Sequence, residues 1–309
     1  MKIPIITGPT AVGKTNIVLK LAKKMNAEIV CMDSRQIYKK INIGTAKPTP
    51  DEMKIVDHHL FDFVELENNY SAYDYRKDAL ETIKKIMKKN KTPMLVGGTG
   101  LYIDALIKGF LNVSSDYGLR TYLKKLEFSN HGILRSILKD IDPESYMKIH
   151  ENDLKRTIRA LEIYIKTGKK MSYFFNKKIN DNYYEYVIIV LDRDRKELHD
   201  RINLRTEKML ENKFIDEVRN ILLTLKTKNL NSLNTIGYKE VIEYLEGKIN
   251  YDTMVHLIKR NTRRYARRQI IYFRKLQGAH WLNISNLTEK EIIEKILNIY
   301  GGKKDAREI

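Results

Sequence analysis

The sequence predicts an α/β fold, in which a P-loop-type parallel sheet core is flanked by helices and carries an inserted, mostly helical domain. Three observations support this prediction. A glycine-rich loop joins a short apolar strand to a helix near the N-terminus, and apolar strands alternate with helices along the first third of the chain. A strand-like apolar run then returns after a long helical stretch, as expected for a domain inserted into a sheet.

The glycine-rich loop is the run Gly8-Pro9-Thr10-Ala11-Val12-Gly13-Lys14-Thr15, which matches the pattern G-x-x-x-x-G-K-[ST] at every position. It lies between an expected strand, Ile3 to Thr7, and an expected helix, Asn16 to Met25. In such a loop, the glycines let backbone N–H groups converge on a phosphate at a helix N-terminus. We therefore expect Lys14 to neutralise phosphate oxygens and the Thr15 hydroxyl to ligate Mg²⁺.

The next elements continue the alternation of strands and helices. Parallel strands are joined by crossover connections that helices usually supply, so this order favours a parallel sheet covered on both faces. The expected elements are a strand from Glu28 to Met32, a loop-rich stretch to Tyr70, a helix from Ala72 to Asn90 and a strand from Pro93 to Val96.

Three of the predicted strands are followed directly by polar or glycine-rich segments. These segments are the phosphate loop with Thr10, the aspartate Asp33, and the run Gly97-Gly98-Thr99. Ligands of open α/β sheets bind outside the carboxyl ends of the strands. We therefore expect the three loops to converge on one crevice.

The middle of the chain has a different pattern. From about Ser114 to Tyr186 it is helical and rich in tyrosine and lysine, and the apolar strand Val187 to Leu191 follows. We therefore predict a catalytic core of residues 1–113 and 187–309 and an inserted helical domain of residues 114–186. After the returning strand the chain is expected to be almost wholly helical, with main helices at Arg195 to Leu210, Phe214 to Leu225, Tyr238 to Glu246 and Thr253 to Lys275.

The composition is strongly basic. Lysine and arginine number 57 against 39 aspartates and glutamates, a formal net charge of +18. This excess favours a polyanionic partner, with nucleic acid ahead of an anionic membrane surface. No apolar run reaches the length of a membrane span, and the N-terminus enters a strand almost at once, so we expect no membrane partner and a cytoplasmic protein. Cys31 is the only cysteine, which excludes an intrachain disulfide.

One predicted helix is basic throughout. Between His256 and Lys275 the sequence has eight lysines and arginines and no carboxylate. A mixed-charge helix would be typical of an ordinary solvated face, whereas like charges at i, i+4 are unfavourable without a counter-anion. We therefore favour a nucleic-acid or phosphate-binding face. Helical spacing places on one broad side Arg260, Arg263, Arg264, Arg267 and Arg268.

Asp33 admits two functional roles. A carboxylate at a strand end beside a phosphate loop either ligates Mg²⁺ through water or accepts a proton from a substrate. Its neighbours Ser34, Arg35 and Gln36 suit the edge of a nucleobase, and the basic chain predicts a polynucleotide, so we favour the second role. A structural aspartate that caps a turn or forms an ion pair is the remaining alternative.

Two other classes of protein explain part of these features. A small-molecule kinase accounts for the phosphate loop, but not for the positive charge or the acid-free helix. A non-catalytic RNA-binding protein accounts for the charge, but not for the placement of Thr10, Asp33 and Thr99 at strand ends.

Several short segments along almost the whole chain form a specific pattern by their order and spacing, although each alone is a weak signal. These segments are Gly8 to Thr15, Asp33 to Tyr38, Gly44 to Pro48, Tyr70 to Ala72 with Asp74, Gly97 to Tyr102, Arg159 to Glu162, Gly237-Tyr238 and Arg267 to Gln269. Together they resemble the tRNA dimethylallyltransferases, the tRNA isopentenyltransferase or IPP transferase family, in their bacterial form. Enzymes of this family place a five-carbon isoprenoid on the N6 amine of the adenosine 3′ to the anticodon.

The resemblance implies a transferase that moves the dimethylallyl group of dimethylallyl diphosphate to this amine and releases diphosphate, with Mg²⁺ as cofactor. The implied partners are the tRNA anticodon stem-loop and dimethylallyl diphosphate, and we expect a monomer. By the resemblance, the loop Gly8 to Thr15 binds the diphosphate and Arg201 and Arg205 close over it. Asp33 would take the proton of the amine. The implied catalytic residues are Thr10, Lys14, Asp33 and Arg201.

The resemblance also implies a set of tRNA-contacting residues, among which Ser34 and Gln36 are candidates to hold a base flipped out of the anticodon loop. The chain departs from the family at Ile271-Tyr272, where many relatives have Thr-Trp, and we leave both out of the site. The implied tRNA-binding residues are Asp33, Ser34, Arg35, Gln36, Thr99, Arg120, Lys155, Arg156, Thr157, Ile158, Arg159, Asn234, Thr235, Ile236, Gly237, Tyr238 and Lys239.

Overall fold

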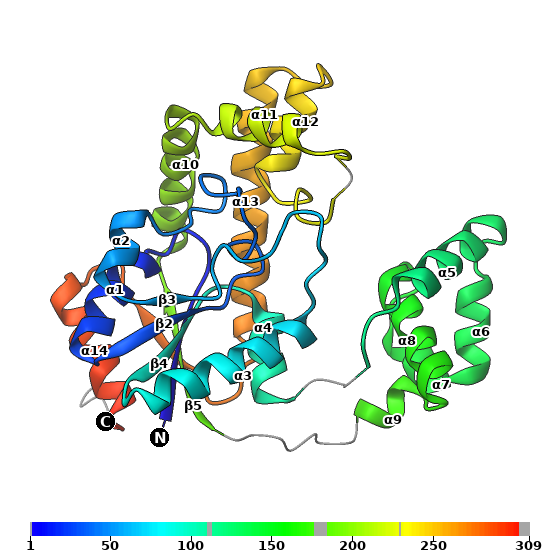
Figure 1. The fold of residues 1–309 in the computed structure, drawn as a ribbon, viewed down its shortest axis with the longest axis horizontal. Coiled ribbons are helices and arrows are strands. Elements are labelled where there is room, and N and C mark those ends of the chain that lie inside the picture. The colour runs from blue at the N-terminus through cyan, green and yellow to red at the C-terminus, as the bar shows by residue number, and fades with distance from the viewer. Residues whose placement is uncertain (1, 110–112, 176–183, 229, 303–309) are drawn as a thin grey trace. The chain divides into compact units, whose positions relative to one another are not determined.

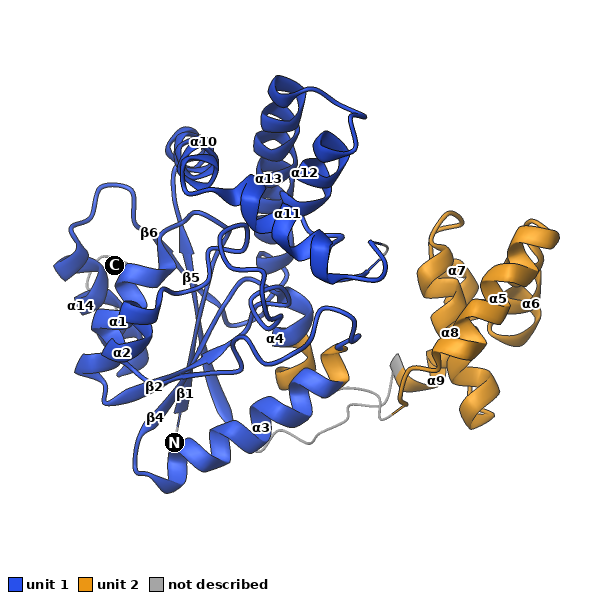
Figure 2. Ribbon diagram, turned by 45° about the horizontal axis from the view of Figure 1, so that its top comes forward, with its two compact units in different colours: residues 1–70, 74–103, 183–309 blue, residues 71–73, 104–182 orange. Residues whose placement is uncertain are grey.

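A computed structural model of the chain describes residues 2–109, 113–175, 184–228 and 230–302. It contains two compact units (Figure 2). The first unit comprises residues 1–70, 74–103 and 183–309, and the second comprises residues 71–73 and 104–182. Most of the second unit is therefore a single stretch of chain inserted between two parts of the first.

A six-stranded sheet, parallel throughout, forms the centre of the first unit (Figure 1). Its strand order is β3-β2-β4-β1-β5-β6, so the strand that leads into the phosphate loop is an inner one. Ile5 of this strand lies opposite Leu95 on one side and Ile188 on the other. The strands are β1 (Lys2–Thr7), β2 (Ala27–Cys31), β3 (His58–His59), β4 (Thr92–Val96), β5 (Glu185–Asp192) and β6 (His280–Asn283).

Both faces of the sheet are buried, because successive strand residues point to opposite sides. Ile6 and Ile189 pack in a cluster with Leu21 and Ile296, which belong to helices on one face. Ile5, next to Ile6, is fully buried on the other face. This double burial explains why the strands read as continuous apolar runs, the pattern from which the parallel sheet was predicted.

Helices connect and extend the strands of the first unit. Among the described residues, no helix combines the length and the apolar character needed to cross a lipid bilayer. The helices are α1 (Lys14–Lys24), α2 (Pro50–Ile55), α3 (Ala72–Lys88), α4 (Gly100–Ile107), α10 (Arg195–Glu211), α11 (Phe214–Thr224), α12 (Tyr238–Leu245), α13 (Tyr251–Phe273) and α14 (Glu289–Tyr300), of which α3 and α4 each have one end in the second unit.

Two strands were not predicted from the sequence. The stretch before Tyr70 was expected to be loop, but β3 pairs with β2 there. The chain after Leu191 was expected to be almost wholly helical, but β6 adds a strand beside β5. Both lie at the edges of the sheet, where β3 has two residues and β6 buries only Leu282, so neither produces an apolar run.

The second unit is a helical cluster around its own apolar core, which includes Leu134, Leu138 and Leu161. The fully buried carboxylate of Glu162 accepts hydrogen bonds from both Arg120, at 2.8 Å, and Arg159. Its helices are α5 (Tyr117–Ser129), α6 (Ile133–Ile141), α7 (Pro143–Lys148), α8 (Leu154–Thr167) and α9 (Met171–Phe175).

A buried carboxylate lies on β2 in the first unit. The Glu28 side chain is 1% exposed, and its oxygens lie 2.6 Å from His59 Nε2, 2.8 Å from Lys91 Nζ and 3.2 Å from Lys89 Nζ. Burial raises the pKa of this carboxyl, but the hydrogen bonds from Lys91, His59 and Lys89 outweigh it and hold the pKa at about 2. Because the folded-state pKa lies below the ordinary value of 4.5, the anion stabilises the fold.

We expect Glu28→Gln to remove a pH-dependent part of the stability. The contribution of the carboxylate is complete above about pH 4.5 and is lost as the pH falls toward 2, and it amounts to at most about 3 kcal/mol. Urea denaturation at pH 6 and pH 3 measures it. The loss of unfolding free energy between the two values should be smaller in the variant than in the parent. The exposed Glu81→Gln, whose partner is Lys85, is the matched control and should behave like the parent.

Candidate active site

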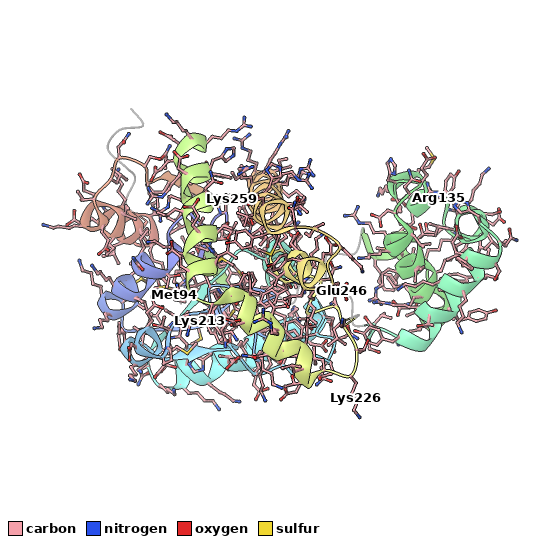
Figure 3. The ribbon with its side chains drawn as sticks, turned by 90° about the horizontal axis from the view of Figure 1, so that it is seen from above. Met94, Arg135, Lys213, Lys226, Glu246 and Lys259 are labelled. Carbon is pink, nitrogen blue, oxygen red and sulfur yellow. The ribbon has the colours of Figure 1, made fainter. Side chains whose placement is uncertain are left out.

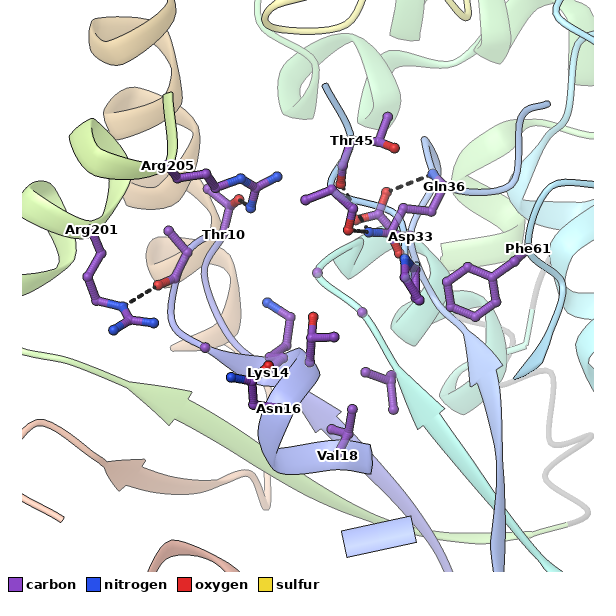
Figure 4. A pocket seen from close by; sticks show the side chains of 18 of the residues that line it. Thr10, Lys14, Asn16, Val18, Asp33, Gln36, Thr45, Phe61, Arg201 and Arg205 are labelled. Atoms are coloured by element: carbon purple, nitrogen blue, oxygen red, sulfur yellow. Dashed lines mark hydrogen bonds between the residues drawn. The ribbon is translucent and has the colours of Figure 1, made fainter. Parts of the chain in front are cut away.

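The carboxyl ends of the inner strands surround a cavity of about 400 Å³ (Figure 4). The phosphate loop follows β1, Asp33 follows β2 and Gly97-Gly98 follows β4, and all of them line the cavity. The helix after β5 closes it with Arg201 and Arg205. The predicted convergence of strand-end loops is therefore present.

The phosphate loop has the backbone that its glycines permit. Gly8 and Gly13 have φ values of +148° and +103°, which side chains disfavour, and a Cβ atom at Gly8 would lie 2.3 Å from the Leu191 carbonyl oxygen. Helix α1 begins at Lys14, so its free N–H groups lie at the end of the loop. The Lys14 ammonium donates to the carbonyls of Gly8, at 2.8 Å, and Pro9, at 3.0 Å.

Three arginines hold the loop from the opposite side. Arg201 Nε donates to the Ala11 carbonyl at 2.9 Å, and Arg205 Nη1 donates to the Thr10 hydroxyl oxygen at 3.1 Å. Figure 4 shows both arginines reaching from α10 toward the loop. The third is Arg193, whose Nε donates to a loop carbonyl, that of Val12, at 2.8 Å.

Charge in the cavity is predominantly positive. Burial lowers the pKa of the Lys14 ammonium to about 8, with Arg205 adding to the decrease and Asp33 opposing it. Burial also lowers the pKa values of Arg201 and Arg205. Among the described residues that line this cavity, Asp33 is the one carboxylate. An anionic ligand would relieve this excess of buried positive charge.

Asp33 is fixed by the turn that follows it. Its Oδ1 accepts hydrogen bonds from the backbone N–H groups of Arg35, at 2.8 Å, and Gln36, at 3.4 Å. The backbone N–H of Ser34, the residue directly after Asp33, donates to Thr99 Oγ1 at 2.9 Å. This hydrogen bond connects the loop after β2 to the loop after β4. Within the described part of the chain, both hydrogen bonds to the carboxylate end on Oδ1. Oδ2 is therefore available to a ligand.

A second cavity, of about 290 Å³, adjoins the first. Its lining includes Arg35, Asn234 and Arg268. It offers hydroxyl, amide and guanidinium groups, together with apolar surface from isoleucines and a methionine. The two cavities have five lining residues in common, which therefore stand at their junction: Thr10, Asp33, Thr45, Arg205 and Tyr265.

The family model described as IPP transferase matches residues 36–276, well over half of the chain. The chain belongs to the IPP transferase family. Its similarity to single members extends over nearly the full length. The tRNA dimethylallyltransferase of Petrotoga mobilis is 55% identical over 298 residues, covering 96% of this chain and 98% of that one. The enzyme of the same name from Thermotoga maritima is 50% identical over 297 residues, with coverage of 96% and 97%.

Solved IPP transferase structures agree with the architecture. The full-length tRNA isopentenylpyrophosphate transferase of Bacillus halodurans is 37% identical, covers 98% of this chain and 96% of its own, and gives a TM-score of 0.73. A eukaryotic dimethylallyltransferase, described as acting on tRNA, is 26% identical and gives a TM-score of 0.84 over 99% of this chain and 81% of its own. The predicted α/β fold class is confirmed, as is the resemblance to the family.

Most residues that the IPP transferase resemblance implied for the diphosphate and the base lie together in the first unit. Gln36 lines the first cavity, but its amide Nε2 donates to the carbonyls of Thr45 and Ala46, so this group is already engaged. Thr99 lines neither cavity, and its hydroxyl oxygen accepts the hydrogen bond of the Ser34 backbone N–H. The other implied residues that line a cavity are Thr10, Ala11, Gly13, Lys14, Thr15, Asp33, Ser34, Arg35, Arg201, Arg205, Asn234, Thr235 and Ile236.

Several implied tRNA contacts have side chains that are buried or paired within the protein, and their assignment to tRNA stays a prediction. Tyr238 is fully buried and donates to Glu217, and Thr157 and Ile158 are 2% and 3% exposed. Arg120 and Arg159 are tied to Glu162, as described above. Gly237 is buried as well, whereas the implied contacts that remain exposed are Lys155, Arg156, Asn234 and Lys239.

The basic helix is also partly engaged with its own protein. Lys259, which is labelled in Figure 3, lies on α13. It forms an ion pair of 2.6 Å with Glu207 of α10, so this lysine has a counter-anion from another helix. Arg263 is half-buried and donates to Asn203 at 2.8 Å, and Arg260 is half-buried. The predicted basic face is therefore narrower, and its exposed arginines are Arg264, Arg267 and Arg268.

Three residues at the site were missed in the sequence. Arg193 follows the end of β5 directly, and its position after a strand was a usable signal. Gln269 belongs to the family-like run that ends the basic helix, yet its role was not assigned. Tyr265 lines both cavities from the same helix, one turn before Gln269, and helical spacing alone could not separate it from core aromatics.

Proposed function

We propose that the chain transfers the dimethylallyl group from dimethylallyl diphosphate to the N6 amine of the adenosine 3′-adjacent to the anticodon in tRNA. The observation that carries this proposal is the junction of the two cavities. The first cavity is lined by the phosphate loop and several cations, and the second by hydroxyl, amide and guanidinium groups. Thr10 and Asp33 line both cavities. An acceptor amine and an allylic diphosphate placed on the two sides would meet at these residues.

The first cavity suits an allylic diphosphate. Backbone N–H groups at the start of α1, the Lys14 ammonium and the guanidinium groups of Arg201 and Arg205 would bind the diphosphate. The apolar part of the lining, which includes Val18, Phe61 and other side chains, would accommodate the five-carbon group.

The residues present also fit Mg²⁺. The Thr15 hydroxyl lines the cavity in the first turn of α1, and Asp33 is the one carboxylate among the described lining residues. Mg²⁺ usually keeps few protein ligands and takes the rest from substrate phosphates and water, so Thr15 would hold it together with the diphosphate. When bound, the ion supplies charge neutralisation to the leaving group.

Asp33 would act as the general base. The adenine amine is a poor nucleophile because its lone pair is delocalised into the ring. As the bond from N6 to the allylic carbon forms and the bond from that carbon to the diphosphate oxygen breaks, the N6 proton would pass to Oδ2 of Asp33. The Thr10 hydroxyl, which accepts a hydrogen bond from Arg205, would donate a hydrogen bond to the departing oxygen.

The second cavity would receive the target adenosine after it leaves the anticodon-loop stack. Unstacking in a single-stranded loop costs only about a few kcal/mol. Asn234 and Ser34 would contact the polar base edges, and Ile236 and Tyr265 would cover its faces. This assigns the second cavity to the acceptor and the first to the donor.

The exposed arginines of α13 and the exposed Lys155 and Arg156 of the second unit would bind the tRNA backbone. We propose the inserted helical domain as a tRNA-binding module and the chain as a monomer in the cytoplasm.

A double variant with Arg264→Ala and Arg267→Ala should bind tRNA more weakly, with a salt slope lower by about 1 to 2 in the plot of log K against log salt. Filter binding at four salt concentrations measures this slope. The exposed pair Lys23→Ala and Lys24→Ala on α1 is the control, and equal slopes in both double variants would remove α13 from the RNA surface.

A transfer assay tests the proposed reaction. The protein is incubated with Mg²⁺, unmodified tRNA and dimethylallyl diphosphate labelled in the isoprenoid, and the label in RNA is followed. We expect incorporation with normal tRNA, and none when guanosine replaces the adenosine next to the anticodon. Absence of transfer, combined with ATP-dependent phosphorylation of a small acceptor, would assign the phosphate loop to a kinase.

A further inference from the structure

A buried glutamine connects two of the loops that form the junction. Gln269, on α13, is 6% exposed. Its Oε1 accepts a hydrogen bond from the backbone N–H of Thr10 at 2.8 Å, and its Nε2 donates to the Gly98 carbonyl at 2.9 Å. One side-chain amide therefore links the phosphate loop to the loop after β4.

The close approach depends on glycine. A Cβ atom at Gly98 would lie 2.3 Å from Gln269 Nε2. One turn further along α13, the Tyr272 hydroxyl donates to the Gly100 carbonyl at 2.8 Å, and a Cβ atom at Gly100 would lie 2.1 Å from the Tyr272 ring. Both contacts lie on the same side of the helix, since the two residues are three positions apart.

Thr10 is consequently held at two points. Its backbone N–H is bound by Gln269, and its hydroxyl oxygen accepts from Arg205 Nη1. Because the guanidinium can only donate, the hydroxyl hydrogen points away from it and remains free to donate to a ligand. Hydrogen bonds in such a chain polarise one another, which makes this hydroxyl a stronger donor.

We propose that Gln269 is a positioning residue for prenyl transfer, which acts by fixing the Thr10 hydroxyl against the oxygen that leaves the allylic carbon. This inference rests on the function proposed above. Each polar atom of the amide has a hydrogen-bond partner within the protein, although Gln269 also lines the first cavity. The proposed role is exerted through Thr10. The two contacts need an acceptor that faces Thr10 and a donor that faces Gly98, and the glutamine amide presents both from one planar group.

Gln269→Met tests the proposal, since methionine keeps the length of the side chain and loses both hydrogen bonds. The rate constant of a single turnover is measured at saturating donor, together with the KM of dimethylallyl diphosphate. We expect the rate constant to fall by about 10- to 100-fold, as misplacement of a catalytic group does. KM should stay within about threefold, because the interaction matters in the transition state. Gln277→Met, an exposed glutamine beyond the helix, is the control.

A double-mutant cycle with Thr10→Ala separates positioning from support of the fold. In the Thr10→Ala background no hydroxyl remains to be oriented, so Gln269→Met should change the rate constant by no more than about twofold. An equal fold-loss in both backgrounds, or a raised KM with an unchanged rate constant, would overturn the proposal. The cycle is repeated with Gln269→Glu. This substitution keeps an acceptor for Thr10 and changes the volume of the side chain less than Gln269→Met does.

The transfer activity of the parent protein distinguishes a failure of the proposed function from a failure of the positioning role of Gln269. If the parent shows no transfer of label to tRNA, the proposed function fails. If the parent is active and the cycle shows no coupling between Gln269 and Thr10, the positioning role alone fails.

Discussion

Asp33→Asn should lower the rate constant of prenyl transfer by about 100- to 10,000-fold, the range expected when a general base is removed. Asparagine keeps the size of the side chain and can still accept the backbone hydrogen bonds of Arg35 and Gln36, so the turn after β2 should survive. It cannot accept the proton of the amine at neutral pH. Single-turnover transfer of labelled isoprenoid measures the loss, and filter binding should show tRNA affinity within about twofold of the parent.

The control for this prediction is Asp192→Asn. Asp192 ends β5, accepts a backbone hydrogen bond from Arg193, and lines neither cavity. It therefore reports the cost of changing a strand-end aspartate without removing a base. Turnover by Asp33→Asn at the level of this control would leave the carboxylate with the structural role of holding its turn.

Lys14→Met should reduce kcat/KM for dimethylallyl diphosphate by about 100- to 1,000-fold, as loss of one charged donor at a transition-state anion does. Lys14 is the first residue of α1, and no other lysine lies in the loop. Steady-state kinetics at pH 7 measures the effect. Lys20→Met, on the exposed side of the same helix, is the matched control and should match the parent.

The pH dependence of diphosphate binding tests the role of Lys14 in a second way. Burial places the pKa of Lys14 at about 8 in the free protein, and a bound diphosphate would raise it. Above pH 8 binding must then take up a proton, so affinity should fall by up to about tenfold per pH unit. Fluorescence titration with a non-reactive diphosphate analogue between pH 7 and 9.5 measures this slope. The slope should vanish in Lys14→Met, and its persistence there would assign the titration to another group.

The sequence predicted the inner strands and the phosphate loop well, for a physical reason. Strands buried on both faces must be apolar throughout, and the loop requires glycine at Gly8 and Gly13 because of their backbone angles. The parallel sheet and the meeting of Thr10, Asp33 and Gly98 follow from these constraints. The types of residue that follow the predicted strands were therefore enough to locate the cavity.

Contacts between distant segments could not be predicted in the same way. Gln269 lies 259 positions from Thr10, and although it belongs to a family-like run, its helical position does not reveal that it contacts Thr10. The neutralisation of Lys259 by Glu207 likewise depends on how α10 packs beside α13. The burial of Tyr238 could not be predicted either, because the resemblance indicates a segment and tertiary packing decides which of its side chains are buried.

The wall that the two cavities have in common has a pharmacological consequence. A single compound that joins a diphosphate mimic to an adenosine through a short spacer would fill both spaces at once, with the spacer passing Thr10 and Asp33. Linking converts the second binding step into an intramolecular one, at an effective concentration on the order of millimolar for a well-fitted spacer. Such a bisubstrate compound should bind far more tightly than either half alone.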